Sequence, residues 1–588
     1  MNKNIKTLKT DFAEAFKHYK NKNFKNAEIT CYKILSIDPN HLDSISLLGS
    51  ISALNKNFDK AQEFMHKILK IDSKNISALN NLGTAYKELG KTKEAIITYQ
   101  KVLEINPNHV NGNYNLGSTY YQLKEFKNAK KYLQKTIGLQ NNFALAFLGL
   151  ANVHADLKEY GEALSSYQKA IEINPQLIMA YNNIGLLYRQ LNDFSNAKEN
   201  YQKAIKIKPD YANSHHNLAL TYKEIGDFNK SIECHENAIK YEPENLMHYH
   251  FLSELKKDIL NTDLEKKINK KIYEKKTTRN NLAFGNFILA KYERRAKNYQ
   301  KEFNYLTDGH KNFFYMYKKK FDLNNKFCFD DVHKIMEGGK ITKTNIKENI
   351  DVRPIFIIGL PRTGTTLVER IISSGEKFLP IGEETEIIGY YITKKILEKQ
   401  SLNLGKDYEI RNELVGIYKE RGLILKKYDY TFTDKSLDNF FYLELINQIF
   451  PNAKIINCRR NVLSSIMSIF QNILTSLSWT HRMDDIFKYF DNYFSIIETY
   501  NSVNPNSIYE LNFEKLIDSP EEESKKLMKF CELPWNKKCL EFYKRKDLFS
   551  KTASNIQIRE GIFKHAKDKY LPYKKLLSKY EKKYSWFK

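Results

Sequence analysis

A chain of 588 residues is too long for one hydrophobic core, so two or more domains are expected. The 42% of hydrophobic residues suffice for globular domains, and the charges are too evenly mixed for a wholly disordered protein. A formal net charge of +25 would suit nucleic acid, a membrane surface or an anionic substrate, but lysine is spread along the whole chain. This general residue bias means that charge alone selects no partner.

The six cysteines are widely scattered, and none forms a Cys-x-x-Cys pair. Neither a disulfide scaffold nor a metal site is therefore predicted. The residues after Met1 contain no apolar run that resembles a signal peptide, and no stretch approaches the roughly 18 apolar residues of a membrane span. We expect a cytoplasmic protein with reduced thiols, no membrane span and no nucleic-acid partner.

Residues 1–245 repeat with a period of 34, as small residues and prolines recur on one grid. Such a helix-turn-helix unit is typical of tetratricopeptide repeats, in which small residues let two helices approach closely and proline ends the second helix. The pattern predicts a solenoid of seven repeats. The recurring positions are Gly49, Gly83, Gly117, Ala151, Gly185 and Ala219; Ala27, Ala61, Ala95, Ala129, Ala163, Ala197 and Ser231; and Pro39, Pro107, Pro175, Pro209 and Pro243.

An asparagine lies two positions before several members of the glycine register, at Asn81, Asn115, Asn183 and Asn217. The first helix of each repeat lines the concave face of such a solenoid, so these amides would form a ladder. An amide both donates and accepts, and could therefore hold the backbone of a bound protein or peptide. The arrangement resembles the peptide-binding superhelix of O-GlcNAc transferase. The alternative is that asparagine is simply common at this position and in this chain.

Residues 246–349 remain helical and lysine-rich but lose the 34-residue grid. Residues 281–315 could form one degenerate repeat, and we expect this connector to pack the solenoid onto the C-terminal domain. The composition changes at Ile355, so a second domain is assigned to residues 350–588.

Residues 353–359 read as a buried parallel strand, because a β-branched run ends at a glycine. A turn and the apolar-periodic helix 367–373 come next. Strand, loop and helix N-terminus together offer N–H groups and a positive dipole end to an anion.

Gly359 and Gly364 have the spacing of a Walker A loop, but Thr365 stands where that loop has lysine. The Walker lysine reaches the β- and γ-phosphates, so its absence argues against a kinase or ATPase. Arg362 instead supplies a fork suited to a tetrahedral oxyanion.

This segment resembles the 5′-phosphosulfate loop of sulfotransferases, and the resemblance extends over nearly all of residues 354–588. It is closest to bacterial tetratricopeptide-sulfotransferase proteins and more distant to tyrosylprotein sulfotransferases. The resemblance implies an α/β, P-loop-like fold with a parallel sheet, 3′-phosphoadenosine 5′-phosphosulfate (PAPS) as donor, and no metal. It assigns donor binding to Pro361, Arg362, Thr363, Gly364, Thr365 and Thr366.

Gly382-Glu383-Glu384-Thr385 matches a segment of the tyrosylprotein enzymes whose second glutamate is the catalytic base, here Glu384. A carboxylate can remove the acceptor hydroxyl proton as the sulfuryl group is transferred in line. Glu383 would point elsewhere. Those enzymes have an arginine after the threonine where this chain has Glu386, which leaves acceptor specificity open.

Residues 434–440 are similar to the family pattern Asp-Lys-x-Pro-x-Asn-Phe, with Leu437 in place of proline. Lys435 matches the lysine that neutralises the bridging oxygen as the leaving phosphate forms. Stabilising developing charge is usually the largest catalytic contribution. Arg362 and Lys435 are thus the catalytic cations.

A second buried strand ends at Arg459-Arg460, and Ser468 lies on the next helix. Ligands of open α/β sheets bind at the carboxyl ends of the strands. The Arg-x₇-Ser spacing resembles the family's 3′-phosphate site, which selects Arg460 and Ser468. Near the C-terminus, residues 552–559 resemble a donor-covering segment with Ser554 and Arg559 as candidate contacts.

The sequence thus favours a PAPS-dependent sulfotransferase whose repeats recruit the acceptor or a partner. The competing hypothesis is an interaction scaffold with an inactive transferase domain; joint retention of Glu384, Lys435, Arg362, Arg460 and Ser468 argues against it. A protein tyrosine, a sugar and a small molecule all stay open as acceptors, and so does the oligomeric state.

Overall fold

The structure is a computed structural model that describes residues 2–338, 340–342, 352–375, 379–399, 403–426, 430–545, 547, 549–562 and 570–587. By its internal contacts the chain divides into two compact units, Met1–Ser214 and His215–Lys588. The boundaries at residues 245 and 349 stay predictions, and the second lies outside the described residues. The first unit holds six helix pairs, and the seventh pair belongs almost entirely to the second.

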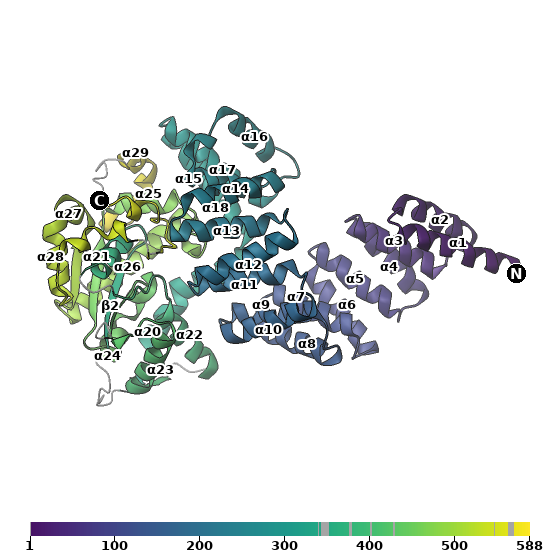
Figure 1. Ribbon diagram of the computed structural model, residues 1–588, viewed down its shortest axis with the longest axis horizontal. Coiled ribbons are helices and arrows are strands. Elements are labelled where there is room, and N and C mark those ends of the chain that lie inside the picture. The colour runs from purple at the N-terminus through teal and green to yellow at the C-terminus, as the bar shows by residue number, and fades with distance from the viewer. Residues whose placement is uncertain are drawn as a thin grey trace. The chain divides into compact units, whose positions relative to one another are not determined.

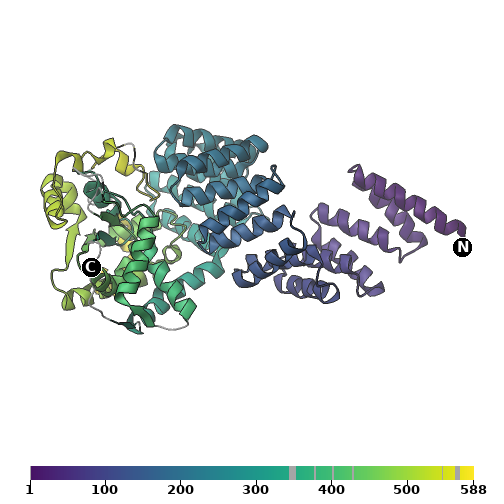
Figure 2. The ribbon, with the colours of Figure 1, turned by 60° about the horizontal axis from the view of Figure 1, so that its bottom comes forward.

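The first unit is a stack of helix pairs, one pair for each 34-residue repeat, and the pairs lie side by side in both views (Figures 1 and 2). The predicted solenoid is therefore confirmed. Its helices are α1 Asn2–Lys20, α2 Phe24–Ile37, α3 Leu42–Leu54, α4 Phe58–Ile71, α5 Ile76–Glu88, α6 Thr92–Ile105, α7 Val110–Gln122, α8 Phe126–Leu139, α9 Ala144–Asp156, α10 Tyr160–Ile173, α11 Ile178–Gln190 and α12 Phe194–Ile207.

The glycine register explains how closely the helices of a pair approach. A Cβ atom added to Gly83 on α5 would lie 2.5 Å from Cε1 of Tyr99 on α6. The same geometry returns in a later repeat, where a Cβ on Gly185 would lie 2.6 Å from Cε1 of Tyr201. Both tyrosines are fully buried, so the glycine makes room for a ring that fills the core of the repeat.

The turn inside each pair has a register of its own. One residue per turn has a positive φ, and these residues are again spaced by 34: Lys22, Lys56, Gly90, Lys124, Lys158, Asn192 and Gly226, with φ between 58° and 86°. Lysine occupies four of these seven turns. The left-handed backbone alone therefore does not require glycine there, although it usually favours it.

The second unit begins with the seventh pair, α13 Ala212–Ile225 and α14 Phe228–Tyr241, and continues through further helices. The predicted degenerate repeat forms a helical hairpin, α17 Arg279–Arg295 and α18 Tyr299–Met316, whose turn residue Lys297 has a φ of 58°. The other helices of this stretch are α15 Leu246–Leu255, α16 Thr262–Ile272, α19 Lys318–Lys326 and α20 Val332–Gly338, with a π-helical turn at Phe327–Asp331 between the last two.

The second unit is built on a four-stranded, wholly parallel sheet in the order β4-β2-β5-β6, which confirms the predicted α/β class. Its strands are β2 Arg353–Gly359, β4 Thr431–Asp434, β5 Lys454–Arg459 and β6 Ile508–Asn512; β1 Lys340–Thr342 and β3 Asn403–Lys406 form a separate parallel pair. The helices between and after the strands are α21 Thr365–Ser373, α22 Ile387–Lys399, α23 Asp407–Glu420, α24 Leu443–Ile449, α25 Val462–Phe470, α26 Met483–Val503, α27 Phe513–Asp518, α28 Pro520–Phe530, α29 Leu571–Lys574 and α30 Ser578–Glu581.

The central strand β2 is buried from Pro354 to Gly359, as its β-branched run predicts. Its side chains alternate between two hydrophobic cores, one on each face of the sheet. Ile355 and Ile357 belong to the core that includes α21, whereas Phe356 and Ile358 belong to the core that also contains Phe284 of α17 and Leu306 of α18. The helices after the seventh pair thus share a core with the sheet.

Among the described residues, no helix is both long and apolar enough to cross a membrane.

Candidate active site

The predicted site residues of the second unit gather at the carboxyl edge of its parallel sheet. The loop 360–364 comes after β2, Lys435 after β4, and Arg460 after β5. Because all strands run in the same direction, these ends share one edge, where open α/β sheets bind their ligands. Residues that are distant in sequence are therefore brought together by the sheet.

The loop after β2 requires two of its glycines. Gly359 has a φ of 146°, and a Cβ there would lie 2.8 Å from the carbonyl oxygen of Cys458. Gly364 precedes α21 with a φ of 95°, and a Cβ there would lie 2.3 Å from Cδ2 of Phe513. With Gly364 at the N-cap, the first N–H groups of the nine-residue helix α21 have no partner within the helix. These amides can receive an anion.

Arg362 lies at the tip of this loop with a φ of 69°, and its guanidinium is fixed by neutral acceptors. Its Nε donates to Ser468 Oγ at 2.9 Å, Nη1 to Ser554 Oγ at 2.6 Å and Nη2 to Gln557 Oε1 at 3.2 Å. Arg460 donates from Nη1 to the carbonyl oxygen of Arg362 at 3.0 Å. Four of the predicted donor-binding residues thus contact one another directly.

The two arginines form a cationic pocket. Arg362, Arg460, Ser468 and Ser554 line it, together with Tyr570. Burial first, and the neighbouring Arg460 after it, lower the pKa of Arg362 to about 10. No carboxylate in the described part of the chain lies within 4.0 Å of either guanidinium. The two guanidinium groups are half-buried and repel each other, and their hydrogen-bond partners are neutral, so the pocket fits an anionic ligand.

A second cluster of charges lies beside the end of β4. Lys435 is only 1% exposed, and its Nζ lies 3.7 Å from Glu383 Oε1 and 3.8 Å from Glu384 Oε1. Glu383 is fully buried, whereas 40% of the Glu384 side chain is exposed. The sequence-based view that the two glutamates point differently agrees with this geometry, and Glu384 is the one open to solvent.

Although part of the side chain is exposed, partial desolvation raises the pKa of Glu384 above its usual range. Lys435 opposes this effect, and the carboxylates of Glu383 and Glu386 add to it. Burial would lower the pKa of Lys435, but Glu383, Glu384 and Glu369 outweigh it and raise that pKa. Lys435 therefore carries its positive charge at neutral pH, and Glu384 holds a proton more readily than an ordinary glutamate. This combination suits a base opposite a fixed cation.

Asp434 fixes the backbone that presents Lys435. Its Oδ1 accepts from the Ser436 N–H at 2.9 Å and from Asn439 Nδ2 at 3.1 Å. Its Oδ2 accepts from Tyr418 Oη at 2.6 Å and from Thr385 Oγ1 at 3.0 Å. One carboxylate thus joins the loop of Lys435 to the loop of Glu384, which gives a physical reason for the Asp-Lys-x-x-x-Asn pattern.

Two buried charges on α21 escaped the sequence analysis. Glu369 is fully buried, accepts from Thr433 Oγ1 at 2.9 Å, and has a pKa that burial raises to about 7. Arg370 is 1% exposed, and its Nη2 lies 3.5 Å from Glu383 Oε2. A charged pair in the middle of an apolar helix was the signal in the sequence, but it does not say which partners the charges meet.

Residues 549–559, called the strap here, join the two parts of the site. Ser550 Oγ and the Lys551 N–H donate to Glu383 at 3.0 and 3.3 Å, while Ser554 accepts from Arg362. Thr552 lies between them, with its Oγ1 3.0 Å from Ser550 Oγ and 3.4 Å from Thr366 Oγ1. Ser550 and Gln557 were missed by the sequence analysis, because serines and glutamines in a loop carry no pattern of their own.

Arg559, the other predicted donor contact on the strap, has different partners. Its Nη2 donates to the carbonyl oxygen of Glu224 on α13 at 3.1 Å, and its Nε donates to Asn555 Oδ1 at 3.3 Å. Its role as a donor ligand stays a prediction.

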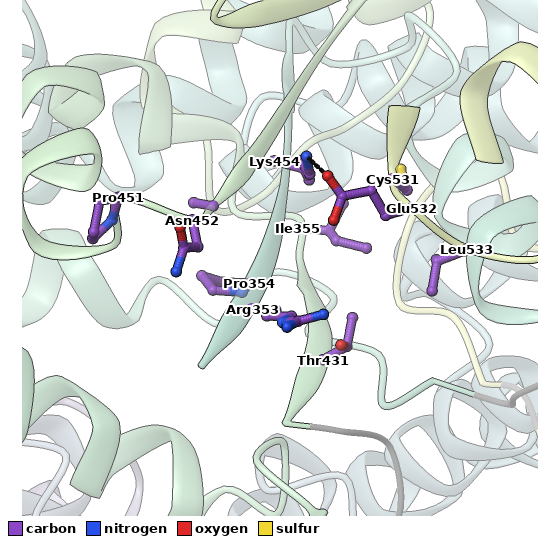
Figure 3. Close-up of a pocket in the computed structure, with 11 residues that line it drawn as sticks. Arg353, Pro354, Ile355, Thr431, Pro451, Asn452, Lys454, Cys531, Glu532 and Leu533 are labelled. Atoms are coloured by element: carbon purple, nitrogen blue, oxygen red, sulfur yellow. Dashed lines mark hydrogen bonds and ion pairs between the residues drawn. The ribbon is translucent and has the colours of Figure 1, made fainter. Parts of the chain in front are cut away.

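A second pocket, of about 310 Å³, lies at the opposite edge of the sheet (Figure 3). It is formed where β2, β4 and β5 begin, and it contains the ion pair between Lys454 Nζ and Glu532 Oε1 at 2.6 Å. No predicted site residue lines it.

In the repeats, two of the predicted asparagines form hydrogen bonds with asparagines outside the predicted ladder. Asn81 is exposed, whereas Asn115 and Asn183 are half-buried. Asn115 Nδ2 donates to Asn80 Oδ1 in the preceding repeat at 3.0 Å, and Asn183 Nδ2 donates to Asn152 Oδ1 at 2.9 Å. These two amides therefore connect neighbouring repeats, whether or not they also bind a ligand.

Comparison with known proteins identifies the part of the second unit that contains the sheet, because residues 354–537 match the model of the sulfotransferase family. The chain carries a sulfotransferase-family domain. Tetratricopeptide-repeat models match residues 83–124, 151–191 and 185–226, and residues 110–143 and 212–245. A model of anaphase-promoting complex, cyclosome, subunit 3 matches residues 20–102 within the repeats. The predicted combination of repeats with a C-terminal sulfotransferase domain is confirmed.

One curated relative is an uncharacterized protein of Aquifex aeolicus (strain VF5), 30% identical over 319 residues, which are 50% of this chain and 40% of the relative. The chain thus spans about two fifths of that relative's length. Similar solved structures are repeat proteins: MamA, 28% identical over 28% of this chain and 95% of its own with a TM-score of 0.26, and PilF of Pseudomonas aeruginosa, 22% identical over 36% and 96% with a TM-score of 0.32. A repeat protein of Parabacteroides merdae, 19% identical over 44% and 100%, has a TM-score of 0.38.

Proposed function

We propose that the sulfotransferase domain transfers a sulfuryl group from PAPS to an acceptor hydroxyl. The observation that carries this proposal is the pocket in which the half-buried Arg362 and Arg460 lie beside neutral hydrogen-bond partners. A donor with several negative charges supplies the missing counter-charge. Charge-assisted hydrogen bonds from two guanidinium groups and from the N-terminus of α21 would hold it.

In this proposal Pro361–Thr366 bind the 5′-phosphosulfate, and Arg460 with Ser468 bind the 3′-phosphate. Arg362 bridges the two positions, since its side chain contacts Ser468 and its carbonyl oxygen accepts from Arg460. Ser554 on the strap completes the pocket. The resemblance to sulfotransferases and the contacts among these residues support the same assignment.

The proposed chemistry uses the cluster at the end of β4. Glu384 takes the proton of the acceptor hydroxyl while the oxygen of that hydroxyl forms a bond to sulfur. The bond between sulfur and the bridging phosphate oxygen breaks, and its electron pair leaves on 3′-phosphoadenosine 5′-phosphate (PAP). Lys435 stabilises the negative charge that develops on that oxygen. The exposure of Glu384 and the burial of Lys435 support this division of roles.

The acceptor class is proposed only broadly, as a protein or another extended molecule that the repeats recruit. The groove asparagines of the repeats support a bound peptide, because the amides of Asn115 and Asn183 keep hydrogen-bonding capacity beyond their contacts to neighbouring asparagines. Replacement of Asn115, Asn183 and Asn217 by alanine should abolish enrichment of peptides from a displayed library. Unchanged enrichment would exclude the ladder as the binding element.

Two measurements test the enzyme proposal. Titration calorimetry of the full chain with PAP tests the donor site, and incubation with PAPS labelled in its sulfate tests transfer to the protein, polysaccharide or small-molecule fraction of a cell extract. Binding with label in one fraction supports the proposal and names the acceptor class. Binding without any transfer would favour an interaction scaffold with an inactive domain, and no binding would refute the donor assignment.

A further inference from the structure

One backbone oxygen of the seventh repeat holds the strap. The carbonyl oxygen of Glu224, near the C-terminus of α13, accepts from the Ser550 N–H at 3.0 Å, from Arg559 Nη2 at 3.1 Å and from Asn555 Nδ2 at 3.3 Å. The last carbonyls of a helix lack partners within the helix, so they are available to such donors. Ser550 is fully buried and Asn555 is 2% exposed, which excludes water from this contact.

Two of these donors, Ser550 and Arg559, lie on either side of the residues that contact the donor loop, and Asn555 lies between those residues. Ser550 also binds Glu383, which lies beside Lys435, whereas Ser554 and Gln557 both accept from Arg362. The strap therefore forms hydrogen bonds to the repeat at both ends, through Ser550 and Arg559, and to the donor loop in its middle, through Ser554 and Gln557. Release of the repeat contact would free the side chains that orient Arg362.

Gly226 indicates that this contact is specific to the seventh repeat. The same turn position carries lysine or asparagine in five of the six earlier repeats, all with a positive φ. Backbone conformation therefore does not demand glycine at this position. What distinguishes Gly226 is its neighbour, because a Cβ atom there would lie 2.4 Å from Cζ of Arg559. The glycine makes room for the arginine that reaches the Glu224 carbonyl.

We propose that the turn after α13 positions the donor-binding strap, so that the seventh tetratricopeptide repeat is part of the transferase site. This inference rests on the proposed donor site. Glu224, through its carbonyl oxygen, and Gly226 and Arg559 are positioning residues. They act on the donor through Ser554, Gln557 and Arg362.

The chain contains a matched control for the test. Gly90 occupies the same turn register four repeats earlier, also with a positive φ, of 74°, and a Cβ there meets nothing within 4 Å. Gly90→Ala and Gly226→Ala thus introduce the same kind of backbone strain, and only the second displaces Arg559. Two properties of the full-length variants would be measured: their affinity for PAP by calorimetry, and the hydrogen exchange of the amides of residues 550–559 without nucleotide.

Gly226→Ala should weaken PAP binding about tenfold, the effect of losing one or two hydrogen bonds that order the site. Strap amides, that of Ser550 above all, should exchange faster than in the wild type. Gly90→Ala should change neither property. Combining Gly226→Ala with Arg559→Ala should cost no more affinity than Arg559→Ala alone, because both act on one contact.

Equal PAP affinity and equal strap exchange in Gly226→Ala and Gly90→Ala would overturn the inference. Additive losses in the double variant would also overturn it, since Arg559 would then act on the nucleotide independently of the turn. A wild-type protein that does not bind PAP refutes the proposed function instead. The exchange comparison then still decides whether the repeat positions the strap.

Discussion

Substitution by glutamine should affect different properties at the neighbouring glutamates: mainly stability at Glu383, and mainly turnover at Glu384. Glu383 is fully buried, lies within 4 Å of Arg370 and Lys435, and accepts from Ser550 and from the Lys551 N–H. Glu383→Gln removes the charge that compensates two buried cations. Breaking a buried ion pair from one side costs about 3–5 kcal/mol, and we expect the lower value because glutamine keeps a hydrogen bond to Ser550.

Glu384→Gln should instead cost less than about 1 kcal/mol of stability, because the side chain is 40% exposed and its ion pair is partly screened. Its effect should appear in turnover, where loss of a general base costs about 10²- to 10⁴-fold. PAP binding should persist, since Glu384 makes no contact to the cationic pocket in the described structure.

The unfolding of the second unit can be followed selectively. All three tryptophans of the chain, Trp479, Trp535 and Trp586, lie in His215–Lys588, so their fluorescence in urea reports on that unit alone. Glu383→Gln should lower the midpoint of this transition, and Glu384→Gln should leave it nearly unchanged. Equal destabilisation by the two substitutions, or normal turnover of Glu384→Gln, would refute the assigned roles.

Two further predictions concern the donor and the base. Arg460→Ala should weaken PAP much more than adenosine 5′-phosphate, whereas Arg459→Ala, whose side chain pairs with Glu510 at 2.7 Å, should leave both affinities unchanged in calorimetry. Equal weakening of both nucleotides by Arg460→Ala would remove the 3′-phosphate assignment. Turnover should rise with pH as Glu384 loses its proton, and Glu386→Gln should shift this rise to lower pH, because Glu386 helps to raise the Glu384 pKa. A pH–rate profile that Glu386→Gln leaves unmoved would contradict Glu384 as the base.

The repeats and the strand-loop-helix unit could be predicted from sequence, because both depend on local periodicity. The 34-residue spacing fixes the helix pairs, and the β-branched run before Gly359 fixes the central strand. Lys435 was found from the resemblance alone, and Arg460 from the resemblance together with its place after a predicted strand. Each of these signals lies within one contiguous segment.

The features that escaped prediction depend on contacts between distant segments. Glu383 meets Arg370 and Ser550 across more than one element, and nothing near Ser550 in sequence indicates that encounter. The same holds for the division of the chain. The repeat grid continues through residue 245, but the seventh pair packs with the second unit, which a periodic pattern does not reveal.

The place of the seventh pair has a consequence for how such chains can change in length. Within the described residues, the hydrophobic cores on the two faces of the sheet contain no residue before Leu246, so the seventh pair is tied to the transferase through the Glu224 carbonyl, which accepts from Ser550, Asn555 and Arg559. We therefore expect gains and losses of repeats to be tolerated upstream of residue 212. Recombination that joins a foreign array after residue 245 would replace Glu224 and Gly226 together. A grafting experiment should therefore keep α13 and α14 with the transferase domain. A cut at residue 245 would separate Glu224 and Gly226 from the strap that they position.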